Sequence, residues 1–181
     1  MTKIVILEYS LYGHITQLSR SIKKGIESVG VEVEHLRCAD TLPSEIREQM
    51  HAPRKPEDVR ELPPTEVNEL EGFDGIMFGV SARDGGIPAQ MKTIMGATGG
   101  LWQNGKLVGK TAGVFQSTGT MQGGQESVAM NCMSFFAHQG MVFIPVGYID
   151  PRCFLMRKSM EDLLGEVGPM PDRMVRGSLP P

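Results

Sequence analysis

Long apolar runs are missing from this chain of 181 residues, and cysteine, aromatic residues and excess positive charge are all scarce. No stretch approaches the roughly 20 apolar residues of a membrane-spanning helix, so we expect no membrane span. The formal net charge of −3 argues against nucleic acid as a partner, because basic surfaces drive that binding. Met1 leads directly into strand-like sequence, so we expect no signal peptide and a cytoplasmic location.

Cysteine usage also excludes several classes of site. Cys38, Cys132 and Cys153 are odd in number and form no Cys-x-x-Cys pair. This usage fits a reducing compartment and predicts no metal site. No Gly-x-Gly-x-x-Gly sequence is present, so the dinucleotide-binding fingerprint is absent. The length suits one domain with a full hydrophobic core.

Five short apolar runs alternate with helical patterns. The runs lie near residues 3–9, 31–36, 74–80, 111–116 and 142–146, and a helix with an apolar stripe is expected over about 14–29. A second clear helix should run from Gln125 to Gln139 and end at Gly140 in the left-handed conformation. Such alternation predicts an α/β fold with a doubly wound, five-stranded parallel sheet of flavodoxin-like order 2-1-3-4-5.

Two segments depart from this alternation. Prolines break residues 40–70, which we expect to be an extended surface excursion with a short helix beginning near Thr65. Prolines also interrupt the last residues, where only a short helix over Ser159 to Leu164 fits. We therefore expect a flavodoxin-like domain over residues 1–148 and a divergent extension over residues 149–181, with the C-terminal helix shortened or absent.

Three loops should meet at the carboxyl edge of the sheet, where ligands of open α/β sheets bind. They are Ser10–Ile15, Val80–Ile87 and Gln116–Gly124. In the first loop, the Ser10 hydroxyl and the amides of Tyr12 to Ile15 lie at a helix N-terminus, which favours an anion. The alternative is an ordinary strand-to-helix turn capped by Ser10. The other two loops can flank a planar ring, so the layout suits a mononucleotide.

Four motifs resemble those of the WrbA-like NAD(P)H:quinone oxidoreductases, which are FMN proteins of the flavodoxin-like fold. The first is YSLYGHI from Tyr9, and the second is QMKTIMGATGGLW from Gln90. The third and fourth are STGTMQGGQE from Ser117 and AHQGM from Ala137. Together they extend over most of the chain, from the first strand to about Tyr148.

The resemblance implies roles for individual residues. The FMN phosphate would be held by Ser10, Tyr12, Gly13, His14 and Ile15. The flavin would be bordered by Arg83 and Gly85 and, on its other side, by Ser117, Thr118, Gly119, Thr120 and Gly123. The catalytic pocket for nicotinamide or quinone would include Tyr12, Trp102 and His138, the last often contributed across a subunit boundary. The residues alone leave another interpretation open, in which His138 complements a helix dipole and Trp102 is ordinary packing.

Two departures from the family pattern keep two functions open. The second loop reads VSARDGG from Val80 where the family has close to TPTRFGN, which places Asp84 at an aromatic position, and the C-terminal region differs as well. In the first hypothesis the chain is an FMN enzyme that reduces quinones with NAD(P)H. It is then expected to work not as a monomer but as a homo-oligomer, either a dimer or a tetramer. In the second it is a structural subunit of a larger assembly that has lost FMN binding partly or wholly.

Overall fold

The computed structural model describes residues 1–120 and 124–147, and residues 1–144 form one compact unit. Its strands are β1 (Lys3–Tyr9), β2 (Glu32–Cys38), β3 (Arg60–Leu62), β4 (Gly75–Ser81), β5 (Thr111–Ser117) and β6 (Val142–Phe143). Its helices are α1 (His14–Glu27), α2 (Ser44–Gln49), the 3-10 helix η1 (Pro64–Gly72), α3 (Ala89–Ala97), α4 (Gly99–Gln103) and α5 (Gln125–Gln139). The division at residue 148 stays a prediction, because the expected extension and its short helix lie outside the described residues.

All strand pairs in the sheet are parallel, and the order is β3-β2-β1-β4-β5-β6. The five expected strands have the predicted flavodoxin-like order, and the sheet gains β3 at the edge beside β2. This sixth strand was not predicted, because three residues in a proline-rich stretch are too few to show a periodic pattern. The last strand ends at Phe143 rather than near residue 146, and Pro145 has no N–H to donate to a ladder.

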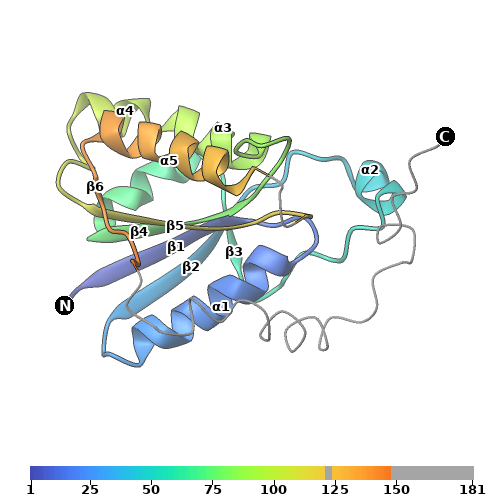
Figure 1. Ribbon diagram of the computed structural model, residues 1–181, viewed down its shortest axis with the longest axis horizontal. Helices are drawn as coiled ribbons and strands as arrows, with labels where there is room; N and C mark the ends of the chain where they lie inside the picture. Colours follow the sequence, from blue (N-terminus) through green and yellow to red (C-terminus); the bar gives the residue numbers. More distant parts are fainter. Residues whose placement is uncertain (121–123, 148–181) are drawn as a thin grey trace. The chain divides into compact units, whose positions relative to one another are not determined.

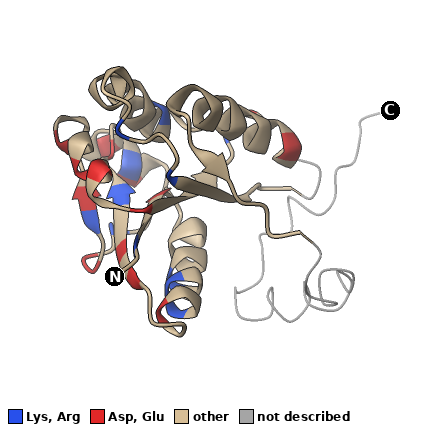
Figure 2. Cartoon of the chain, turned by 90° about the vertical axis from the view of Figure 1, so that its left-hand side faces the viewer, with Lys and Arg blue, Asp and Glu red and all other residues tan. Residues whose placement is uncertain are grey.

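Helices cover the sheet on two sides. Figure 1 shows α3, α4 and α5 above the sheet and α1 below it. On the α5 side the core is aromatic, with the Phe78 and Phe136 rings 5.1 Å apart between centroids. Helix α5 carries one acidic residue, Glu126, and no Lys or Arg, and the upper helices are mostly tan in Figure 2. The excursion of residues 40–70 contains α2, β3 and η1, so the short helix expected near Thr65 is present as η1.

The α1 side of the sheet differs from the prediction. The expected apolar stripe begins with Ile15, which is fully buried, but Leu18 is 41% exposed. Thr16 and Ser19 are buried in its place. The strands beneath α1 carry polar side chains there, so the face of the helix that meets them is partly polar.

Glycine conformation sets the ends of both long helices. Gly13 (φ 88°) precedes α1, and Gly124 (φ 76°) precedes α5. Gly140 (φ 70°) ends α5 in the left-handed conformation, as predicted. Since residues with a Cβ rarely adopt these angles, glycine at these points fixes where the loops give way to the helices.

Candidate functional site

Three loops meet at the carboxyl edge of the sheet, following β1, β4 and β5, because these strands are parallel neighbours. The second and third loops are tied together. Ala82 N donates to Ser117 O at 2.9 Å, and Ser127 Oγ at the start of α5 donates to Gly85 O at 2.6 Å. Ser127 was not predicted as a site residue, because nothing in its sequence context indicates that it reaches a loop 42 residues away.

The first loop has the geometry of an anion site. Ser10 is buried, and its Oγ accepts a hydrogen bond from Ile15 N at 3.2 Å. This bond is the one expected if Ser10 simply caps an ordinary strand-to-helix turn. The Ser10 oxygen is the acceptor in it, so the hydroxyl hydrogen is still available to a ligand. Gly13 has no side chain to cap the first turn of α1, and the position of a Cβ there meets no atom within 4 Å. Within the described residues the amides of Tyr12 to His14 have no hydrogen-bond acceptor, and they lie at the positive end of a helix.

Tyr12 is held over the first loop. Its side chain is 46% exposed, and its hydroxyl donates to Met50 O at 3.2 Å. The Tyr12 ring therefore lies at the surface of the site, between the first loop and the segment after α2. His14 is exposed at the first position of α1.

The second loop is a tight turn. Arg83 N donates to Gly86 O at 3.0 Å and Gly86 N to Arg83 O at 2.8 Å, so the two residues form an antiparallel bridge. Between them Asp84 (φ 52°) and Gly85 (φ 72°) both have positive φ, as in a type I′ turn. Asp-Gly is a favoured pair in such a turn, so the residues that depart from the family pattern here form a tight turn. The Arg83 side chain is exposed.

The third loop continues β5 at Ser117. Thr118 Oγ1 donates to Thr120 O at 2.6 Å and accepts from Gln125 Nε2 at 2.8 Å, which links the loop to the first residue of α5. Gly119 and Thr120 are exposed. The predicted residue Gly123 lies outside the described residues.

His138 and Trp102 lie near the amino edge of the sheet, opposite the edge at which the three loops meet. His138 is in the last turn of α5, 13 residues after Gln125, and a rise of about 1.5 Å per residue places it about 20 Å from the start of this helix. Trp102 in α4 is 60% exposed and precedes β5 at the amino edge of the sheet. Gln139 Nε2 donates to Thr98 Oγ1 at 2.8 Å, which joins the ends of α5 and α3 there. The structure thus separates these two residues from the three loops within one chain.

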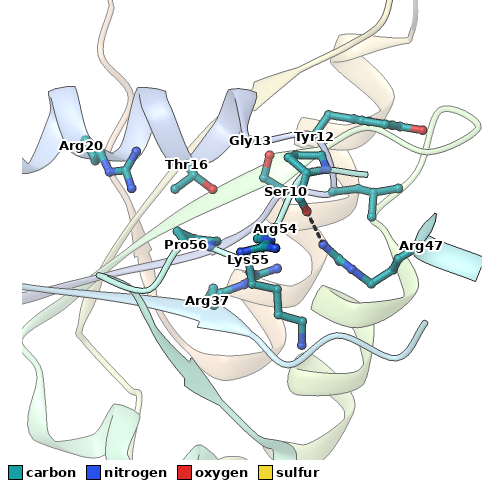
Figure 3. A pocket seen from close by; sticks show the side chains of 12 residues that line it. Ser10, Tyr12, Gly13, Thr16, Arg20, Arg37, Arg47, Arg54, Lys55 and Pro56 are labelled. Atoms are coloured by element: carbon teal, nitrogen blue, oxygen red, sulfur yellow. Dashed lines mark hydrogen bonds between the residues drawn. The ribbon is translucent and has the colours of Figure 1, made fainter. Parts of the chain in front are cut away.

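A basic cavity of about 310 Å³ lies beside the first loop, on its β2 side. The loop residues Ser10 to Gly13 form one wall. Its basic residues are Arg20, Arg37, Arg47, Arg54 and Lys55. Figure 3 shows these side chains converging from α1, β2, α2 and the segment that follows α2. Sequence reasoning missed this cluster, because the whole excursion of residues 40–70 is acidic on balance and only folding brings these cations together.

A buried polar cluster lies under α1, next to this cavity. Glu8, His35 and Arg37 project from β1 and β2, and each is less than one tenth exposed. Burial raises the pKa of Glu8 to about 7, against the lowering effects of the Thr16 hydrogen bond and the Arg37 charge. Burial lowers the pKa of His35 to about 4, helped by Lys23 and Arg20.

Neither metal ligation nor membrane insertion is indicated within the described ranges. No group of three or more His, Cys, Asp or Glu side chains there is placed to hold a metal ion. No helix among residues 1–120 and 124–147 is long and apolar enough to cross a membrane.

The parallel sheet and its phosphate-type first loop define a flavodoxin-like protein, and solved structures agree. The chain matches a WrbA-like flavodoxin from Agrobacterium tumefaciens with a TM-score of 0.59 and 20% identity, over 83% of this chain and 82% of that one. It matches a mutant flavodoxin from Pseudomonas aeruginosa with a TM-score of 0.55 and 15% identity, over 92% and 96%. At such identities the likeness shows the fold alone.

Sequence relatives define the family. Residues 2–150 match the profile of the NADPH-dependent FMN reductases. The NAD(P)H quinone oxidoreductase YCP4 of Candida albicans is 46% identical over 90% of this chain and 55% of its own length. PST3 of the same organism, also named an NAD(P)H quinone oxidoreductase, is 40% identical over 90% of this chain and 79% of its own length. The chain belongs to the NADPH-dependent FMN reductase family, and the resemblance to the WrbA-like quinone oxidoreductases is confirmed. It spans about half the length of YCP4.

Proposed function

We propose that this chain is an FMN-dependent enzyme that reduces quinones by two electrons with NAD(P)H as co-substrate. The observation that carries the proposal is the first loop. There the free amides before α1, a left-handed Gly13 and the Ser10 hydroxyl, which also accepts from Ile15 N, leave a site for a phosphate beside two loops that can border a flat ring. The names of the two Candida albicans relatives support the same reaction.

The described residues fit FMN. Ser10 and the amides of Tyr12 to His14 would hold its phosphate, whereas the Ile15 amide, also expected to do so, donates to Ser10 Oγ. The turn at Arg83 and Gly85 would border the ring on one side. Ser117 to Thr120 would lie along the other side, and the bond from Ala82 N to Ser117 O keeps the two loops together. The chain requires no nucleophile of its own, since bound FMN supplies the electron transfer between NAD(P)H and quinone.

The residues of this chain position the reactants. Tyr12, held by Met50 O, would form one wall of the pocket for nicotinamide or quinone. His138 and Trp102 would complete that pocket from a second copy of the chain, since within one chain they lie near the amino edge of the sheet, away from the three loops. We therefore propose a homo-oligomer as the working form, and composition supports the cytoplasm as its location.

The absorption spectrum of the purified protein tests the proposal. We expect flavin bands that persist after gel filtration, or a rise in melting temperature when FMN is added to protein without it, since a ligand selective for the native state stabilises that state. The loaded protein should oxidise NADPH or NADH only when a quinone is present. A melting temperature that saturating FMN leaves unchanged would reject the function.

The tight turn at Asp84 and Gly85 favours a second candidate, a structural subunit that has lost FMN. This turn places an exposed carboxylate where the family pattern has an aromatic residue. In that case the protein would be colourless, show no FMN binding and be isolated with a different chain.

A further inference from the structure

A serine stands at the carboxyl end of each of three neighbouring strands, β1, β4 and β5. The register of β4 and β5 pairs Ser81 with Ser117. The register of β1 and β4 pairs Tyr9 with Val80, and continuing it by one residue places Ser10 beside Ser81. Because paired residues of parallel strands point to the same face of the sheet, the three serine side chains form a row along its carboxyl edge.

This serine row (Ser10, Ser81 and Ser117) lies on the face of the sheet that α1 covers. A Cβ at Gly79 would meet Ile15 Cγ2 in α1 at 2.8 Å, so position 79 points toward α1. Side chains two residues apart on a strand share a face, so Ser81 points the same way. Neighbouring strands are about 4.8 Å apart, so the row extends for about 10 Å from the first loop toward the third.

The Ser81 hydroxyl is buried and has no hydrogen-bond partner within residues 1–120 and 124–147. It is the only hydroxyl among the buried side-chain atoms there that lack a partner. Buried polar groups of native proteins are nearly always hydrogen-bonded, so this hydroxyl needs a bound molecule to supply the missing bond. The residue as a whole is half-buried at the edge of the sheet, within reach of a ligand bound there.

Ser81 also departs from the family pattern. In VSARDGG it stands where TPTRFGN has proline, which carries no hydroxyl, and the two threonines of that pattern are Val80 and Ala82 here. The second loop of this chain therefore has one hydroxyl, and the register of the sheet directs it into the serine row.

We propose that Ser81 is a cofactor-binding residue whose hydroxyl donates a hydrogen bond to the ribityl chain of bound FMN. The inference rests on the proposed function, because it assumes that FMN binds. With the phosphate at Ser10 and the ring between the second and third loops, the chain that links them must pass along the serine row. The ribityl chain carries hydroxyl groups, which can accept a hydrogen bond from Ser81 and donate one to another serine oxygen.

Binding of two flavins tests this contact without any reaction. FMN and riboflavin share the ring and the ribityl chain and differ in the phosphate, and calorimetry measures the affinity of the full chain for each. Ser81→Ala should lower both affinities by the same factor, about tenfold, because one buried hydrogen bond to the shared chain is lost. Ser10→Ala, at the proposed phosphate site, should weaken FMN far more than riboflavin. Ser21→Ala, which removes an exposed hydroxyl from α1, is the matched control and should change neither.

The pattern of losses identifies the part of FMN that Ser81 contacts. Unchanged FMN affinity in Ser81→Ala would overturn the proposal, and so would a loss for FMN alone, which would place the hydroxyl against the phosphate. The midpoint potential of the bound flavin distinguishes a contact with the ring. A hydrogen bond to the ring differs in strength between oxidised and reduced flavin, so its removal shifts the potential, whereas loss of a ribityl contact leaves the potential unchanged. A shifted potential in Ser81→Ala would therefore reject the ribityl contact, also where riboflavin binds too weakly to be measured.

The melting temperature of the protein without FMN gives a readout that does not depend on flavin binding. There Ser81→Ala removes a buried donor that has no acceptor, so the variant should melt at the same temperature as wild type or higher. With saturating FMN the order should reverse, because the wild type binds the ligand more tightly. A variant that melts lower than wild type without FMN would show that the hydroxyl is already satisfied inside the protein, and would overturn the proposal.

The same measurements separate this inference from the proposed function. A wild type that binds neither FMN nor riboflavin would reject both. A wild type that binds FMN, together with a Ser81→Ala variant that binds it equally well, would reject the role of Ser81 alone.

Discussion

Thr16 Oγ1 donates a hydrogen bond to Glu8 Oε1 at 2.8 Å, and both side chains are buried beneath α1. His35 Nε2 lies 3.9 Å from the same oxygen. With the pKa of Glu8 raised to about 7 and that of His35 lowered to about 4, both groups are neutral over most of the interval between these values. The folded and unfolded chains therefore bind different numbers of protons at each site, which makes stability depend on pH.

Glu8→Gln isolates one half of this dependence. Between pH 4.5 and 7 the folded protein keeps a proton on Glu8 that the unfolded chain releases, so this site lowers stability as pH rises. Glutamine keeps the acceptor for Thr16 and cannot ionise. Relative to wild type, the free energy of unfolding of the variant should increase across this window, by up to about 3 kcal/mol. Urea denaturation at a series of pH values measures this free energy, and Glu45→Gln, at an exposed position, is the control. If the free energy of unfolding of Glu8→Gln changed with pH in parallel with that of wild type, Glu8 would not be buried and protonated.

His35→Gln should have the opposite effect. Between pH 4 and 6.5 the unfolded chain binds a proton that folded His35 releases, so in the wild type this site raises stability as pH rises. Because the Glu8 and His35 windows overlap and their signs differ, wild-type stability should change little between about pH 4.5 and 6.5. In His35→Gln only the Glu8 effect remains, and its stability should fall with rising pH over that range. The same denaturation series detects it, and an unchanged slope would show that His35 titrates normally in the folded protein.

The sequence predicts the five main strands, their order and both long helices because each depends on local patterns, such as consecutive apolar residues before a glycine-bounded helix. It also predicts the first loop, since Ser10 and Gly13 lie directly between β1 and α1. It does not predict the basic cavity, whose cations come from four separate elements. One signal was available: Arg37 stands between the apolar residues Leu36 and Cys38, directly after the run expected over residues 31–36. A charged residue in such an apolar setting indicates a buried polar contact, although not its partner.

Gly79→Ala tests how closely α1 packs on the sheet. A Cβ at Gly79 would lie 2.6 Å from the Phe115 ring and 2.8 Å from Ile15 Cγ2, both much closer than van der Waals contact. Since Ile15 is fully buried and starts the helix beside the first loop, we expect the variant to lose about 1–3 kcal/mol of stability. FMN affinity should fall with it. Gly96→Ala, where the added Cβ meets no atom within 4 Å, is the control and should be neutral or stabilising.

Asp84→Asn tests the charge at the second loop. Asparagine tolerates the φ of 52° at this position, whereas the aromatic residue of the family pattern would be strained there. A carboxylate near the flavin should disfavour its reduced form, which carries more negative charge. The variant should therefore bind FMN more tightly and show a higher midpoint potential in spectroelectrochemical titration, with Glu126→Gln in the first turn of α5 as a comparison. An unchanged potential would place Asp84 away from the ring, and a shift to lower potential would contradict the charge effect.

The last prediction concerns the two residues at the far end of the chain. His138 and Trp102 are exposed near the amino edge of the sheet, about 20 Å along α5 from the third loop. If they form part of the pocket over the flavin, they must do so from another copy, and a monomer would lack a complete site. Light scattering at low micromolar concentration should therefore show a dimer or tetramer.

Complementation between two variants shows whether the site is shared. Ser10→Asp places a negative charge where the FMN phosphate should bind, and His138→Ala removes the distal residue; each alone should have little quinone reductase activity. When the two are unfolded, mixed and refolded together, some sites combine an intact first loop from one copy with an intact His138 from the other. Activity of the mixture should then exceed that of either variant, because only a shared site can be restored in this way. A stable monomer with full activity, or a mixture no more active than its parts, would show that each chain builds its pocket alone.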